Sequence, residues 1–80
     1  MTDEELKFAL IMLGLAEKDK CKNVWMYDHK ASKTALVCRL GHMNLPTYLI
    51  YDLTLRRLLK QSSNPSQILI DMQEILDEQD

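Results

Sequence analysis

The residues best suited to chemistry are two cysteines and two histidines, Cys21, His29, Cys38 and His42, which fall within 22 residues of one 80-residue chain. Two thiolates and two imidazoles make a tetrahedral set that suits zinc, and a metal would stabilise a domain with a small core. Zinc ligands usually come in close pairs, however, and only Cys38 and His42 are close here. We therefore expect no metal and no other cofactor, with these four residues as weak candidates.

The same side chains offer a Cys–His nucleophile, with Cys38 activated by His29 or His42. Such catalysis also needs an orienting third group and an oxyanion site, and no pattern in the sequence marks either of them. Gly14 and Gly41 stand alone, so the chain contains no glycine-rich phosphate loop. The sequence predicts a protein that is not an enzyme and has no catalytic residues.

Charge is distributed in three blocks along the chain. Residues 1–17 carry a net charge of −3, residues 18–60 hold nine Lys or Arg against three Asp for a net charge of +6, and residues 61–80 hold five acids and no base. The acidic ends can pack over the basic middle, or the middle can present a basic surface to an acidic partner, either protein or nucleic acid.

A nucleic-acid-binding function is the alternative, with residues 30–60 as the binding region. Residues 34–58 can be set as a helix, a turn around Gly41 and a second helix starting near Asn44, which is the layout of a helix-turn-helix. The early part of that second helix is mostly apolar, although reading bases needs polar side chains there. The basic residues available for phosphates are Lys30, Lys33, Arg39, Arg56, Arg57 and Lys60.

Length and composition predict one small domain over residues 1–80. The chain is 46% hydrophobic with two Gly and two Pro, which excludes a disordered class. An 80-residue domain buries only about 60% of its unfolded surface, so its stability is small. No apolar run reaches the roughly 20 residues that span a bilayer, and the acidic start is unlike a secretory signal. We therefore expect a cytoplasmic protein with no membrane partner and with reduced cysteines.

The first helix is predicted over residues 3–16. Thr2 and Glu5 have the spacing of a capping box, and Gly14 either ends the helix or is tolerated inside it. The segment from Leu6 to Ala16 is apolar on almost every side. Since so short a chain cannot surround such a helix by itself, this segment predicts self-association into a homo-oligomer.

The middle of the chain has two interpretations. Residues 23–28 and 34–40 favour β-structure, and the polar residues 29–33 between them favour a loop, which together predict a hairpin. The alternative is a helix over residues 29–40, capped by Asp28 and stopped by Gly41.

Two further helices are predicted over residues 45–78. Asn44 and Pro46 suit a helix start, and Leu45, Leu49 and Leu53 share one helical line. Asn64, with Pro65 after it and Gln67 completing a capping box, starts the last helix. The resulting fold class is α+β but mostly helical, with the order helix–β-hairpin–helix–helix; the alternative is an all-α four-helix domain.

These observations predict a small regulatory module that works by protein–protein binding, of the kind found among phage or mobile-element regulators and inhibitors. The expected partner is a protein, and nucleic acid is the alternative. The expected partner-binding residues are the apolar positions of the first helix, the aromatic pair of the hairpin and the basic side chains, namely Phe8, Ile11, Met12, Leu15, Trp25, Tyr27, Arg39, Arg56, Arg57 and Lys60.

Overall fold

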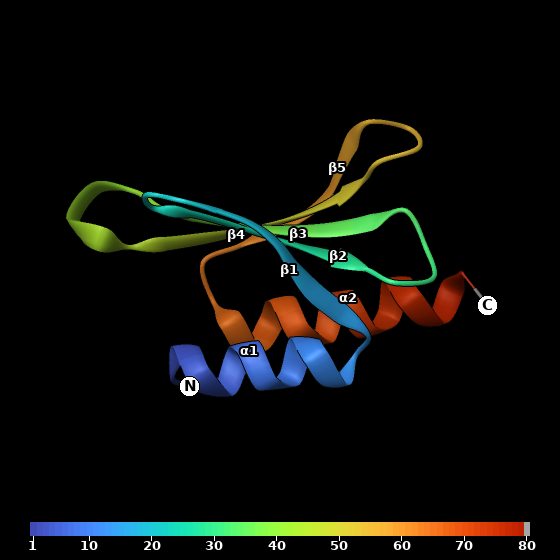
Figure 1. The fold of residues 1–80 in the computed structure, drawn as a ribbon, viewed down its shortest axis with the longest axis horizontal. Coiled ribbons are helices and arrows are strands. Elements are labelled where there is room, and N and C mark those ends of the chain that lie inside the picture. The colour runs from blue at the N-terminus through green and yellow to red at the C-terminus, as the bar shows by residue number, and fades with distance from the viewer. Residues whose placement is uncertain (80) are drawn as a thin grey trace.

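A five-stranded antiparallel sheet with two helices on one of its faces forms the protein (Figure 1). The computed structural model describes residues 1–79. Neighbours in sequence are neighbours in the sheet, whose strand order is β1-β2-β3-β4-β5. The elements are α1 (Asp3–Met12), β1 (Leu15–Cys21), β2 (Val24–His29), β3 (Thr34–Leu40), the 3-10 turn η1 (His42–Asn44), β4 (Pro46–Asp52), β5 (Arg57–Ser62) and α2 (Pro65–Glu78).

The mostly helical fold class is therefore wrong, in both its helix–β-hairpin–helix–helix form and its four-helix form. The hairpin over residues 23–28 and 34–40 is confirmed as β2 and β3, and the helix over residues 29–40 is not formed. The error lies in residues 15–21 and 45–62, which form three more strands.

α1 begins with the predicted capping box and ends earlier than expected. The Thr2 side chain accepts a hydrogen bond from the Glu5 backbone N–H, and the Glu5 side chain caps Thr2 in return. The helix stops at Met12, and Gly14 follows with φ +93, a left-handed conformation that favours glycine after a helix end. A Cβ at Gly14 would also lie 3.0 Å from Nε2 of His29. This glycine turns the chain into β1.

The first of the two helices predicted over residues 45–78 is replaced in its first half by β4, because the apolar residues of this segment are divided between two faces of the sheet. Tyr48 and Ile50 point to the helices and are buried, and Leu49 is buried on the opposite face. A strand buried on both sides reads as a continuous apolar run, which periodicity cannot separate from a helix. Pro46 occupies the first position of the strand, where its missing N–H is tolerated.

A turn between β4 and β5 replaces the predicted second half of that helix. The Asp52 side chain accepts hydrogen bonds from the backbone N–H groups of Thr54 (2.9 Å) and Leu55 (3.1 Å). Arg56 adopts a left-handed φ of 54° before β5 starts. An aspartate that bonds to the backbone two residues ahead favours a turn over a helix.

α2 is the last helix of the prediction and is confirmed. The Asn64 side chain caps the N–H groups of Ser66 and Gln67. The reciprocal half of the predicted capping box is not formed, because the Gln67 amide instead donates to Asp71 at 3.1 Å.

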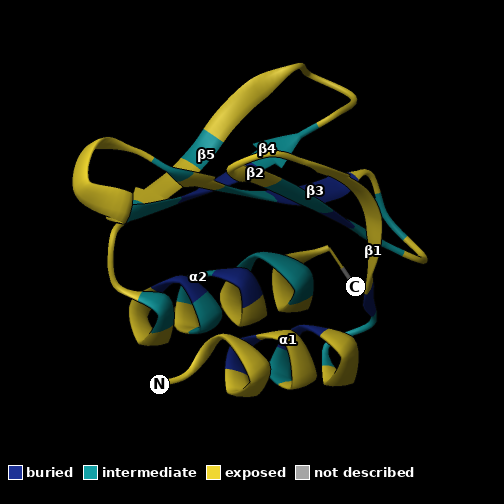
Figure 2. Cartoon of the chain, turned by 60° about the vertical axis from the view of Figure 1, so that its left-hand side comes forward, coloured by how far each residue is buried: buried dark blue, intermediate teal, exposed yellow. Residues whose placement is uncertain are grey.

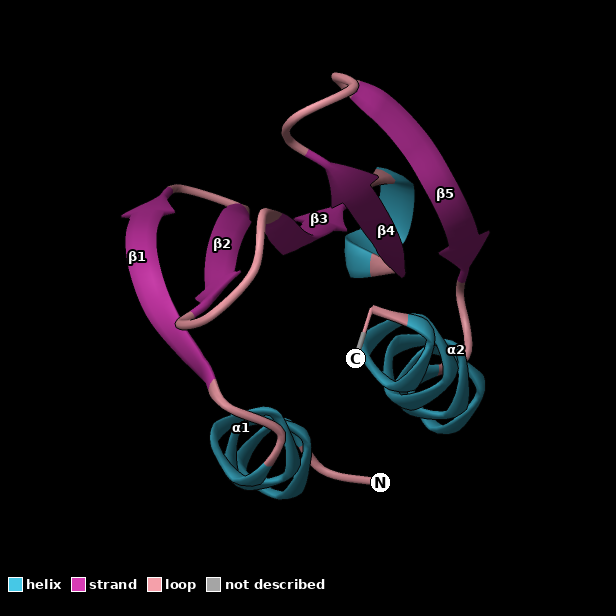
Figure 3. Ribbon diagram, turned by 90° about the vertical axis from the view of Figure 1, so that its right-hand side faces the viewer, coloured by secondary structure: helices cyan, strands magenta, loops and turns pink. Residues whose placement is uncertain are grey.

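The core lies between the sheet and the two helices (Figure 2). α1 lies along β1 while α2 lies along β5 and β4, so the helices sit side by side beneath a curled sheet (Figure 3). The fully buried side chains include Leu10 and Leu15 near β1, Leu36 and Ile50 in the sheet, and Ile68 and Met72 in α2. The sides of both helices that face away from the sheet remain exposed.

Candidate functional site

An apolar groove runs between α1 and α2 on the side that faces away from the sheet. Phe8 and Met12 of α1 lie one helical turn apart and are 65% and 72% exposed, and Ile70 of α2 is 53% exposed. The groove has a volume of about 580 Å³. We call it the helical groove; its lining residues are Phe8, Ala9, Met12, Leu13, Leu69, Ile70, Gln73 and Glu74.

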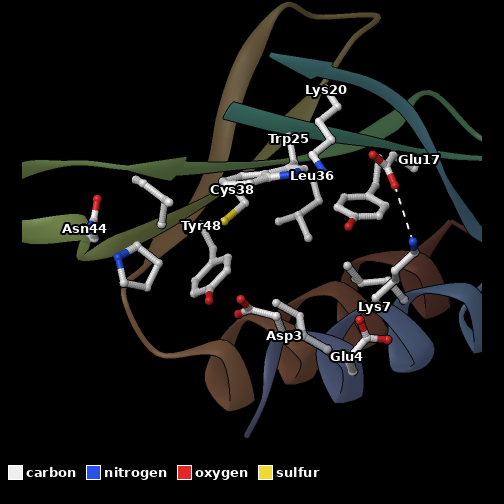
Figure 4. A pocket seen from close by; sticks show the side chains of 15 residues that line it. Asp3, Glu4, Lys7, Glu17, Lys20, Trp25, Leu36, Cys38, Asn44 and Tyr48 are labelled. Carbon is white, nitrogen blue, oxygen red and sulfur yellow. Dashed lines mark ion pairs between the residues drawn. The ribbon is translucent and has the colours of Figure 1, made fainter. Parts of the chain in front are cut away.

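A second hollow opens between the first half of α1 and the sheet, with a volume of about 590 Å³ (Figure 4). Cross-strand pairing places its aromatic walls. Cys38 in β3 is opposite Trp25 in β2 and opposite Tyr48 in β4, so these three side chains form one row on the face toward the helices. Tyr27 stands two positions along β2 from Trp25 and lines the same hollow. We call this hollow the aromatic cleft.

Burial and nearby carboxylates set the acid–base behaviour of the aromatic cleft. Burial raises the pKa of the Cys38 thiol, and the charge of Asp3 raises it further. Burial also raises the pKa of Tyr48, with smaller contributions from Cys38 and Asp3. For Tyr27 burial is again the largest cause of a raised pKa, followed by Glu17. These three groups therefore stay protonated and neutral near neutral pH.

The predicted partner-binding residues differ in how far the structure buries them. Phe8, Ile11 and Met12 are exposed, whereas Leu15 and Tyr27 belong to the core and are not free to meet a partner. Trp25 is half-buried in the wall of the aromatic cleft. The basic candidates are all exposed: Arg39 on β3, Arg56 in the turn, and Arg57 and Lys60 on β5.

The four Cys and His residues are not gathered into a metal-binding group. Within residues 1–79 no three His, Cys, Asp or Glu side chains are placed to share a metal ion. Cys21 is exposed at the end of β1, and Nδ1 of His29 lies 3.0 Å from the Ser32 hydroxyl. Cys38 is opposite Trp25, four positions along β2 from His29. A raised thiol pKa also lowers the thiolate fraction, which is the opposite of what a nucleophile needs.

The helix-turn-helix predicted over residues 34–58 is wrong, because β3, η1, β4, the turn after β4 and the start of β5 occupy this region. Gly41 does lie in a turn, as expected, but the turn joins two antiparallel strands. Nucleic-acid binding by the basic side chains themselves stays a prediction.

Sequence reasoning missed Ile70, Asp3 and Tyr48 as site residues. Ile70 interrupts the otherwise polar side of the last helix, and this isolated apolar residue was a readable signal of a surface site. Asp3 was counted only as one of the acidic residues of the block 1–17. Tyr48 was assigned to a helix, and only the strand pairing of β3 with β4 brings it beside Cys38.

No protein-family description, curated protein or solved structure matches this chain. Neither helix within residues 1–79 is long and apolar enough to cross a membrane.

Proposed function

We propose that the protein is a binding module, acting without catalysis, whose helical groove receives a basic amphipathic helix of a partner protein. The observation that carries this proposal is the exposure of Phe8, Met12 and Ile70 around one apolar groove. Contiguous exposed apolar side chains mark interaction sites on folded proteins. A groove between two helices suits the apolar side of a third helix.

Charge determines which kind of helix fits. The segments that contain α1 and α2, residues 1–13 and 64–79, hold seven acidic residues and one lysine, a net charge of −6. The strands and loops between them, residues 14–63, carry nine basic and four acidic residues, a net charge of +5. An apolar groove in an acidic layer is complementary to a helix with Leu-like residues on one side and Lys or Arg on its flanks.

The same charge argues against pairing the helical layers of two copies. A two-fold dimer through the helical groove would bring two layers of net charge −6 into contact, and like charges across an interface are unfavourable. Homo-oligomerisation stays a prediction, which the experiment below also tests.

The experiment measures binding of a fluorescently labelled peptide of about 18 residues, five helical turns, made only of Leu and Lys with Leu at helical spacing. A second peptide replaces every Lys with Glu. We expect the Leu/Lys peptide to bind at least about tenfold more tightly than the Leu/Glu peptide, with an advantage that shrinks as salt is added.

Two variants test whether the peptide occupies the groove. Met12→Gln and Ile70→Gln should each weaken binding about tenfold, because each removes apolar area from the contact. Met43→Gln is the matched control, since Met43 is 79% exposed but lies in η1, outside the helical groove. Unchanged binding by both groove variants would refute the proposal. A dimer in analytical ultracentrifugation that Met12→Gln abolishes would show instead that a second copy fills the groove.

A further inference from the structure

The aromatic cleft lies on the opposite side of α1 from the helical groove. Its walls combine the apolar residues Leu6, Leu10 and Leu36 with the aromatic rings of Trp25, Tyr27 and Tyr48. Its volume of about 590 Å³ falls in the range of small-molecule sites, which join apolar walls with a few polar groups.

The charged groups of the cleft are three carboxylates and two ammonium groups. Asp3, Glu4 and Glu17 line it together with Lys7 and Lys20. Lys7 and Glu17 form an ion pair, with 3.6 Å between Nζ of Lys7 and Oε2 of Glu17. The one other ion pair found in residues 1–79 joins Lys18 to Asp28, so Asp3 and Glu4 face the opening without a cationic partner.

The charge of Asp3 affects the titrating side chains that line the cleft. In Figure 4 the Asp3 carboxylate lies next to the ring of Tyr48, and the sulfur of Cys38 lies on the other side of that ring. The charge of Asp3 is one of the causes that raise the pKa of Cys38, Tyr48 and Tyr27. The positive end of the α1 dipole, about half a unit charge, offsets only part of the two carboxylates.

The protein's own Lys20 shows which ligands the aromatic wall attracts. Its ammonium nitrogen lies 6.0 Å from the centroid of the Trp25 ring. This is the outer limit of a favourable cation–π contact, and Lys20 itself is exposed.

We propose that the aromatic cleft binds a small organic ammonium ion, whose apolar substituents contact the half-buried ring of Trp25 while the carboxylate of Asp3 balances its charge; Tyr48, which is 4% exposed, lines the cleft from the core. Aromatic rings with an adjacent carboxylate favour weakly hydrated cations such as alkylated ammonium groups. Anions are repelled by Asp3 and Glu4, and a neutral molecule gains only the apolar contact. The proposal is independent of the partner helix, because the two sites use opposite sides of α1.

The test compares choline with 3,3-dimethylbutan-1-ol, a neutral molecule of the same shape in which carbon replaces the charged nitrogen. Trp25 is the only tryptophan and lines the cleft, so its fluorescence reports occupancy, with sodium chloride at equal ionic strength as the reference. We expect choline to bind about five- to tenfold more tightly than the neutral molecule. Equal binding of the two, or no fluorescence change with choline, would overturn the proposal.

Three variants test whether the carboxylate of Asp3 causes the preference for a cation. Asp3→Asn should weaken choline binding about five- to tenfold while leaving the neutral molecule unaffected. Glu74→Gln is the matched control, because it removes one carboxylate from α2 at the helical groove. Lys20→Gln should tighten choline binding, since it removes a competing cation from Trp25. Circular dichroism confirms that each variant is folded; folded Asp3→Asn protein with unchanged affinity for choline would refute the role of Asp3.

Discussion

Shortening the side chains of Ile50 and Leu53 tests whether residues 46–52 form the strand β4 or the helix that the sequence predicts. A helix over this segment places Leu53 in the core stripe, on one line with Leu45 and Leu49. In the structure Ile50 is fully buried in β4, whereas Leu53 is 38% exposed in the turn that follows. If β4 is correct, the substitution at Ile50 should lower the free energy of unfolding more than the one at Leu53. If the helix were correct, the substitution at Leu53 would lower it more.

The expected magnitudes follow from burial. Ile50→Val removes one buried methylene and should cost about 0.5–1.5 kcal/mol of unfolding free energy. At about 4–8 °C per kcal/mol for a domain of this size, the melting temperature should fall by about 2–12 °C. Leu53→Ala should cost less than about 1 kcal/mol. The Leu53 backbone N–H keeps its 2.8 Å hydrogen bond to the Lys33 carbonyl, because the substitution changes only the side chain.

Urea unfolding at neutral pH, followed by circular dichroism, measures both costs. Ile50→Val is preferable to Ile50→Ala, because a loss of about 2–5 kcal/mol would consume much of the roughly 4–12 kcal/mol available to an 80-residue domain. If Leu53→Ala costs more than about 2 kcal/mol while Ile50→Val is neutral, the placement of β4 is wrong.

Two further predictions concern the titrating groups. Since burial raises the pKa of Cys38 from an ordinary 9.0 and those of Tyr27 and Tyr48 from 10.0, the folded state favours their neutral forms; the contribution of these three groups to stability should be constant below about pH 9 and fall as the pH rises past 9 and then 10. Urea unfolding between pH 8 and pH 11 checks this, and stability that does not change over this range would contradict it. Cys21 is exposed and Cys38 is half-buried, so at pH 8 Cys21 should react with a disulfide reagent at least about tenfold faster. Single Cys→Ser variants assign the two rates, and equal rates would show that Cys38 is accessible.

The parts of the fold that the sequence predicted are those set by local contacts. Thr2 and Asn64 cap their helices through side chains that bond two or three residues ahead, and such short-range signals survive in the structure. The β2–β3 hairpin was readable because a polar loop separates two β-favouring runs.

The parts that were missed depend on contacts between distant residues. β1 carries the alternating charges of residues 17–20, which give no strand signal, and it is recruited by pairing with β2 across the turn at Asn23. β4 is a central strand because β3 and β5 pair with its two edges, and its Tyr48 and Ile50 are buried in the core that the helices cover. The aromatic cleft could not be predicted from the sequence for the same reason, because Trp25, Cys38 and Tyr48 become neighbours only through strand pairing.

The unusual composition of α1 has a physical explanation in this fold. Leu6 and Leu10 face the sheet and are buried, while Phe8, Ile11 and Met12 are left exposed although α2 lies alongside. The chain thus covers part of the apolar helix and leaves the rest to the solvent or to another molecule. α1 therefore has two functions in the surface of this fold: Phe8 and Met12 form one wall of the helical groove, and Leu6 and Leu10 form one wall of the aromatic cleft.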